Sequence, residues 1–262
     1  MDLGIKGRVA VVAASSRGLG KAVAEALAAE GAKLALCARD EAGLAETAAA
    51  IKARWRTEVF HQALDVTSET DVKTFVAEAR QRLGNVSICV TNAGGPPPGR
   101  FGAFSARDWR SAFELNFMST LFFITEVLEG MRAQKWGRVV AITSTAVKQP
   151  IDGLILSNGI RSSVVGLMKS LANEYGPDNV LFNNVCPGRF DTDRMRNNAA
   201  KQSAAEGVTV EEIVQRAAQR IPLRRVGDPA EFAAVVAFLC SEKASYVTGA
   251  NILVDGGMVS GV

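Results

Sequence analysis

The stretch that decides the fold is RVAVVAASSRGLGKAVAEAL, residues 8–27. Residues 8–14 form an almost continuous apolar run, which is typical of a strand buried on both faces of a parallel sheet. Apolar residues then recur at helical spacing over residues 19–27, so a turn containing Gly18 and Gly20 joins a strand to a helix. Such a turn presents backbone N–H groups and a helix dipole to a diphosphate. We therefore predict a nucleotide site here.

The rest of the chain continues the same alternation of short apolar runs with helical patterns. Strands followed by helices indicate βαβ units, a parallel sheet and helices on both of its faces. No linker-like segment divides the chain. We predict a single α/β domain over residues 1–262, doubly wound (Rossmann) with a seven-stranded parallel sheet. The expected strands are 8–14, 32–38, 58–64, 86–91, 138–143, 180–185 and 250–255, and the later helices are near 40–54, 68–83, 105–134, 153–175 and 228–240.

Composition and charge limit the classes of molecule that the protein is expected to bind. A formal charge of +3 without long runs of like charge argues against a nucleic-acid groove, so a small molecule or another copy of the chain is expected. No stretch approaches the ~20 apolar residues that span a bilayer. Four scattered cysteines without a C-x-x-C pair indicate reduced core thiols, and the single histidine, His61, leaves no cluster with metal-ligand spacing. We expect a cytoplasmic protein without a metal site.

The end of the second predicted strand indicates the type of cofactor. An acidic residue there would bind the ribose 2′-OH of NAD. The chain instead has Ala38 followed by Arg39, and Arg17 in the glycine turn can converge on the same region. Two guanidinium groups suit a 2′-phosphate, so NADP(H) is favoured over NAD(H). Two alternatives stay open here: Arg39 as a solvated loop residue, and a carboxylate supplied by Asp40.

Several motifs together resemble one known family, the short-chain dehydrogenases/reductases, and in particular its 3-oxoacyl-carrier-protein reductase-like members. The likeness covers about residues 5–258. The motifs are AASSRGLG (13–20), in which Ala14 replaces the first glycine of the family turn, LDV (64–66), TNAGG (91–95), ELNFMST (114–120), ITS (142–144), CPGRFDT (186–192) and the C-terminal block at 221–257.

The resemblance implies specific site residues and an NADP(H)-dependent reduction of a carbonyl, possibly of a 3-oxoacyl thioester. It also implies a homotetramer. The implied catalytic residues are Asn116, Ser144, Ser157 and Arg161. The implied cofactor-binding residues are Ala14, Ser16, Arg17, Gly18, Leu19, Gly20, Arg39, Asp65, Val66, Asn92, Ala93, Gly94, Arg161, Pro187, Gly188, Phe190 and Thr192.

The chain departs from the family within LILSNGIR, residues 154–161. In the family a tyrosine donates a proton to the carbonyl oxygen, and a lysine four residues later binds the nicotinamide ribose. Here Ser157 and Arg161 hold these two places, and the i, i+4 spacing keeps both on one helix face. Serine is shorter and a far weaker acid than a phenol, and arginine stays protonated.

Two interpretations of this departure remain open. The protein is a reductase with a modified catalytic tetrad, in which a water or a substitute donor such as Lys148 or Asp152 supplies the proton. Alternatively, it is a catalytically impaired NADP-binding regulator or partner subunit. Relatives that expel halide keep the tyrosine and lack the nucleotide turn, which is the opposite of this chain.

A basic segment at about 189–225 is expected to fold over the substrate as a lid, by the same resemblance. It contains eight Arg/Lys against five Asp/Glu. Such a balance favours a phosphopantetheine-linked or otherwise acidic substrate. A solvated helical face explains it equally well.

Overall fold

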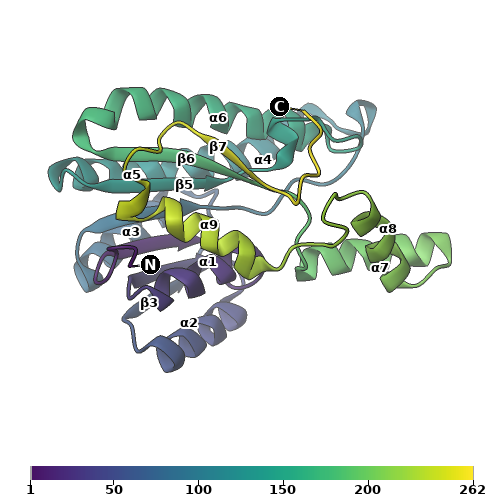
Figure 1. Ribbon diagram of the computed structural model, residues 1–262. Helices are drawn as coiled ribbons and strands as arrows, with labels where there is room; N and C mark the ends of the chain where they lie inside the picture. The colour runs from purple at the N-terminus through teal and green to yellow at the C-terminus, as the bar shows by residue number, and fades with distance from the viewer. Residues whose placement is uncertain (1, 262) are drawn as a thin grey trace.

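The computed structural model describes residues 2–261 and contains one twisted parallel sheet (Figure 1). Within these residues seven strands pair in the order β3-β2-β1-β4-β5-β6-β7, and every pair is parallel. This confirms the predicted seven-stranded Rossmann sheet. The strands are β1 (Val9–Ala13), β2 (Lys33–Ala38), β3 (Val59–Ala63), β4 (Val86–Thr91), β5 (Gly137–Ile142), β6 (Val180–Pro187) and β7 (Asn251–Val254).

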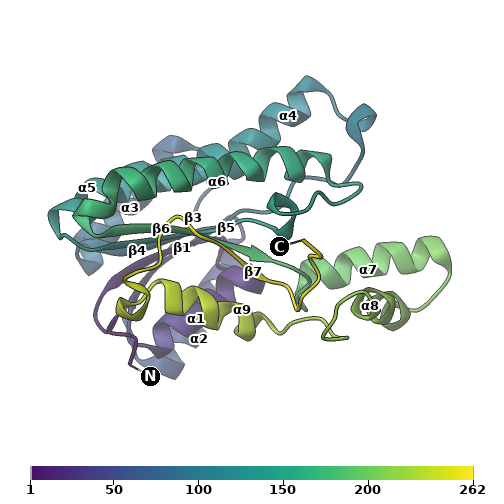
Figure 2. The ribbon, with the colours of Figure 1, turned by 45° about the horizontal axis from the view of Figure 1, so that its top comes forward.

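Helices cover both faces of the sheet, as Figure 2 shows. One face packs against α1 (Gly18–Ala29), α2 (Glu41–Trp55) and α9 (Pro229–Leu239), and the other against α3 (Glu69–Leu83), α5 (Ser119–Ala133) and α6 (Ile155–Tyr175). Each interface is a buried apolar cluster, so β1 is apolar at every position. The remaining helical segments are α4 (Ala106–Phe113), η2 (Glu114–Met118), α7 (Asp193–Glu206), α8 (Val210–Gln219) and the short turns η1 (Phe101–Ala103), η3 (Thr145–Val147), η4 (Gly176–Asp178) and η5 (Glu242–Ala244).

The predicted helix starts are confirmed by their caps. The Ser68 side chain accepts a hydrogen bond from the Asp71 N–H at the start of α3. Asp228 begins α9 with Pro229 in its first turn and completes a capping box with Glu231. These local signals fix where each helix begins relative to the strand before it.

The helical region at 105–134 differs from a single regular helix. It is interrupted by the π-turn η2, which contains Asn116. The Asn116 side-chain N–H donates to the carbonyl of Ala112, and its buried Oδ1 has no partner in the described part of the chain. Single π-turns inside helices are frequent at functional sites.

The sheet order positions the site. The order reverses between β1 and β4, and ligands of doubly wound folds bind outside the carboxyl ends of the strands at this switch point. Helices α7 and α8, which follow β6, project beyond that edge (Figures 1 and 2). Between residues 2 and 261, no helix has the length and apolar character needed to cross a bilayer.

Candidate active site

A cavity of about 580 Å³ opens at the carboxyl ends of β1, β4, β5 and β6. This volume is within the usual range for pockets that bind small molecules and cofactors. Most of the predicted site residues line it, although they come from segments far apart in the chain. They are Ala14, Arg17, Gly18, Leu19, Asn92, Ala93, Gly94, Ser144, Ser157, Arg161, Pro187, Gly188, Phe190 and Thr192.

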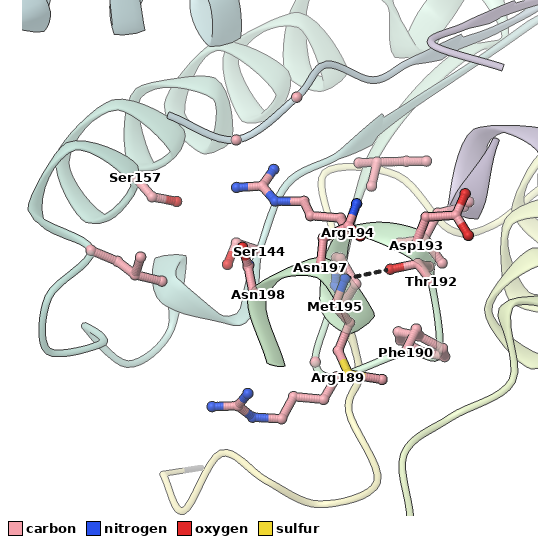
Figure 3. A pocket seen from close by; sticks show the side chains of 18 of the residues that line it. Ser144, Ser157, Arg189, Phe190, Thr192, Asp193, Arg194, Met195, Asn197 and Asn198 are labelled. Carbon is pink, nitrogen blue, oxygen red and sulfur yellow. Dashed lines mark hydrogen bonds between the residues drawn. The ribbon is translucent and has the colours of Figure 1, made fainter. Parts of the chain in front are cut away.

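The glycine turn after β1 is built to leave backbone N–H groups available. Helix α1 has no side-chain cap and no acidic residue in its first turn, in contrast to α2, α3, α4, α7, α8 and α9. Its first N–H groups and dipole therefore remain available to an anion. Thr192, which caps α7, lies against Gly18 from the other side of the cleft (Figure 3). This geometry fits the diphosphate of a dinucleotide.

Close packing explains two unusual residues in this turn. A Cβ on Gly20 would lie 2.2 Å from the carbonyl oxygen of Ala14, so only glycine lets α1 approach the end of β1. Ala14 itself has a φ of 52°, in the left-handed region that favours glycine. The replacement of the family's glycine by alanine therefore leaves the turn in place at a cost of backbone strain.

The predicted adenosine end lies outside the cavity, along the ends of β2 and β3. Arg39 is exposed directly after β2, and Asp65 accepts hydrogen bonds from the N–H and the hydroxyl of Thr67. Asp40 caps α2 by accepting a hydrogen bond from the Gly43 N–H at 3.2 Å. One oxygen of this exposed carboxylate therefore serves as the helix cap. Ser16, Gly20, Val66 and Asn116 also lie outside the cavity lining.

Ser144, Ser157 and Arg161 meet at the ends of β5 and β4. Ser144 follows β5, and its Oγ accepts a hydrogen bond from the Ala146 N–H at 3.1 Å. The Ser157 hydroxyl forms no hydrogen bond with any residue in 2–261. It is therefore available to a bound molecule.

Arg161 is buried, with 8% of its surface exposed, one helical turn after Ser157. Its guanidinium donates to the carbonyl of Ile142 at 2.9 Å and to the carbonyl of Ala93 at 3.5 Å. Burial, together with the smaller effect of the charge of Arg194, lowers the pKa of Arg161 to about 10. The side chain therefore remains a fixed cation at neutral pH.

Neither suggested substitute donor contacts the cavity. Lys148 is exposed, and Asp152 forms an exposed ion pair with Arg100 at 2.9 Å. The two tyrosines are also remote, because Tyr175 ends α6 and Tyr246 is fully exposed after α9. No phenol lines the site among residues 2–261.

Arg194 is a site residue that the sequence motifs did not single out. It belongs to the basic segment at about 189–225, and its side chain extends from α7 toward the part of the pocket where Ser144 and Ser157 lie (Figure 3). A Cβ on Gly95 would lie 2.6 Å from both terminal nitrogens of Arg194, so the guanidinium lies against the turn after β4. Its position two residues after Thr192, in the motif that closes over the cavity, was the available signal.

Comparison with known proteins supports this geometry. A family model described as Enoyl-(Acyl carrier protein) reductase matches residues 13–259. The 3-oxoacyl-[acyl-carrier-protein] reductase FabG of Aquifex aeolicus is 33% identical over 258 residues, which are 98% of this chain and 100% of the relative.

Two solved structures are similar over their full length. L-sorbose reductase from Gluconobacter frateurii, complexed with NADPH and L-sorbose, has a TM-score of 0.97 and 32% identity, and the match covers 100% of each chain. A short chain oxidoreductase from Pseudomonas aeruginosa, bound to NADPH and described as containing an atypical catalytic center, has a TM-score of 0.91 and 28% identity over 99% of each chain. Both cofactors agree with the expectation of NADP(H).

The family model covers nearly the whole chain, and the curated relative matches it from end to end. The fold, the glycine turn at the switch point and the cavity it opens on are those expected from the sequence motifs. The chain therefore belongs to the short-chain dehydrogenase/reductase family of oxidoreductases and is 3-oxoacyl-[acyl-carrier-protein] reductase-like.

Proposed function

We propose that the protein reduces a carbonyl group of a small molecule to an alcohol, with NADPH as the cofactor. The observation that carries this proposal is that Ser144, Ser157 and Arg161 line the same cavity as the glycine turn. When bound, NADPH supplies the hydride. The residues of this chain bind the substrate, orient it and stabilise the charge that develops on its oxygen.

The cofactor-binding residues divide along the cleft. The N–H groups at the start of α1 hold the diphosphate, and Arg17 and Arg39 hold the 2′-phosphate. Asp65 and Val66 contact the adenine end. Residues 92–94 and the segment from Pro187 to Thr192, with Arg161, hold the nicotinamide end.

Charge stabilisation replaces the missing proton donor in this proposal. The hydroxyl groups of Ser144 and Ser157 donate hydrogen bonds to the substrate oxygen, and the fixed charge of Arg161 favours the developing alkoxide. Asn116, which the family resemblance implies as a catalytic residue, lies on its π-turn outside the cavity lining. A water molecule delivers the proton. The loss of a positioned general acid typically costs roughly 10²- to 10⁴-fold in rate, so catalysis is slowed without being abolished.

A second function, a catalytically impaired NADP-binding regulator or partner subunit, is favoured by one observation. Within residues 2–261 no phenol lines the site, whereas the glycine turn before α1 is in place. In this alternative, bound NADPH stabilises one conformation and Arg161 serves to hold it.

Two successive measurements on one sample distinguish the two functions. NADPH binding is followed by cofactor fluorescence, and NADPH consumption is then measured with acetoacetyl thioesters and a panel of ketones. Enzyme-dependent consumption that Ser144→Ala abolishes, without loss of NADPH binding, supports the reductase. Binding without consumption across the panel supports the regulator, and absence of binding contradicts both.

The remaining expectations belong to the same proposal. Residues 189–225, which include α7 and α8, act as a lid of a single domain over residues 1–262. The 3-oxoacyl thioester is the first substrate to test, because the curated relative is named for it. The homotetramer and the cytoplasmic location stay predictions.

A further inference from the structure

The cavity carries an excess of positive charge. The charged side chains that line it are Arg17, Arg161, Arg189, Arg194 and Asp193, which are four cations against one anion among the described residues. None of the four arginines forms an ion pair within residues 2–261. The cofactor phosphates account for Arg17 at the glycine turn. Arg161 and Arg194 lie at the other end of the cleft, where a different anion can bind.

Of these cations, Arg161 is expected to reduce the stability of the fold most, because its charge is buried. It is 8% exposed, and its hydrogen bonds go to two backbone carbonyls rather than to a carboxylate. A buried charge without a counter-ion is destabilising, and a bound anion removes most of that cost. Two of the five N–H donors of the guanidinium are used, so further donors remain for a ligand.

Arg194 lies close to the same place. Its guanidinium contacts the Gly95 turn after β4, and its charge is felt by Arg161. Two other arginines of the lid are paired: Arg196 binds Asp191 through two hydrogen bonds of 2.7 and 2.5 Å, and Arg216 binds Glu206 at 2.8 Å. Arg194 alone of these three is directed into the cavity without a carboxylate (Figure 3).

Position distinguishes these two cations from the phosphate site. Arg161 and Arg194 meet the ends of β4 and β5, beside Ser144 and Ser157, whereas the glycine turn follows β1. An anion held here is therefore next to the carbonyl group that is reduced. A thioester offers no charge at that point, but a free carboxylate does, and planar guanidinium groups bind carboxylates through paired hydrogen bonds.

We infer that Arg194, with Arg161 behind it, binds a carboxylate of the substrate, so that the preferred substrates are oxo acids rather than their esters or thioesters. This inference rests on the proposed carbonyl reduction and specifies its substrate class. Arg194 is the specificity-determining residue, and because it belongs to α7, substrate binding also draws the lid onto the site.

The test compares each acid with its neutral ester, using acetoacetate with methyl acetoacetate and pyruvate with methyl pyruvate. A charge-assisted contact corresponds to roughly 10- to 100-fold in kcat/KM. We expect the wild-type enzyme to prefer the acid of at least one pair by this factor, and Arg194→Gln to remove the preference by raising KM for the acid only. The Kd for NADPH stays within about threefold. Arg216→Gln, which removes a charge of the lid outside the cavity, keeps the preference.

Two outcomes overturn the inference. The first is equal or better reduction of both esters by the wild type, which leaves the reductase intact. The second is an Arg194→Gln variant that weakens NADPH binding and affects acid and ester equally, because Arg194 then serves a cofactor phosphate.

A binding measurement covers the case without turnover. Calorimetric titration of the NADPH complex with acetoacetate and with methyl acetoacetate reports the site directly. Binding of the acid that depends on Arg194, without reduction, supports the carboxylate site and contradicts the proposed reductase. Failure of acetoacetate to bind the NADPH complex, or equal binding of acetoacetate and its methyl ester, contradicts the carboxylate site.

Discussion

Restoring the missing phenol is the sharpest perturbation of this site. Ser157 lines the cavity one helical turn before Arg161, so the ring of Ser157→Tyr enters open space rather than the core. Arg161 remains charged at neutral pH and lowers the pKa of a neighbouring phenol, as a lysine does. The variant thus rebuilds a proton donor beside an intact cation.

The expected gain follows from general acid catalysis. A positioned acid contributes roughly 10²- to 10⁴-fold, which is about 3–5 kcal/mol of the activation free energy. Imperfect fit of the ring costs about 1–3 kcal/mol of folding stability, which thermal unfolding detects separately. We therefore expect kcat for NADPH-dependent reduction to rise at least tenfold over wild type, or to appear where wild type shows none.

The assay is NADPH consumption at saturating cofactor with the best ketone or oxo acid of the panel. Ser157→Phe is the matched control, since it adds the ring without the hydroxyl. The combination of Ser157→Tyr with Arg161→Lys tests whether the family pair does better than the tyrosine alone. Equal rates for the tyrosine and phenylalanine variants, both with wild-type NADPH affinity, would refute the view that the proton donor limits this enzyme.

Three further outcomes are expected from the described residues. The variant Gly20→Ala forces the new Cβ against the Ala14 carbonyl. We expect the free energy of unfolding, measured with urea, to fall by about 1–3 kcal/mol and NADPH binding to weaken at least tenfold. Gly166→Ala is the control, because a Cβ there meets open space, and it should change neither quantity. No histidine or cysteine of residues 2–261 lines the cavity, so we expect kcat/KM to be flat from about pH 6 to about pH 9 and to fall as Arg161 loses its charge above about pH 10. A transition near pH 7 would contradict this assignment. Burial raises the pKa of all four cysteine thiols, that of Cys37 to about 12. A disulfide reagent at about pH 8 should therefore modify none of them until the protein is unfolded. Rapid reaction of the folded protein would contradict this expectation, because it would show an accessible thiol.

The amino-acid pattern alone was enough to predict the fold, the glycine turn and the replacement of the tyrosine–lysine pair. These features are local: apolar periodicity, caps such as Ser68 and Asp228, and the spacing of Gly18 and Gly20 act within one strand or one helical turn. The predicted bounds of α2, α3 and α9 agree with those of the structure to within one residue at each end. The π-turn at Asn116 was not predicted, because the apolar residues of 105–134 were interpreted as one regular helix, and the interruption is a matter of backbone hydrogen bonding.

Only the tertiary structure decided what the arginines and carboxylates do. Asp40 is a helix cap, Arg161 binds carbonyls 19 and 68 residues away, and Arg194 enters the cavity while Arg196 pairs with Asp191. Long charged side chains can point in many directions from the same backbone. Their partners come from strands that meet only in the folded sheet, so their roles depend on packing across the chain rather than on any local pattern.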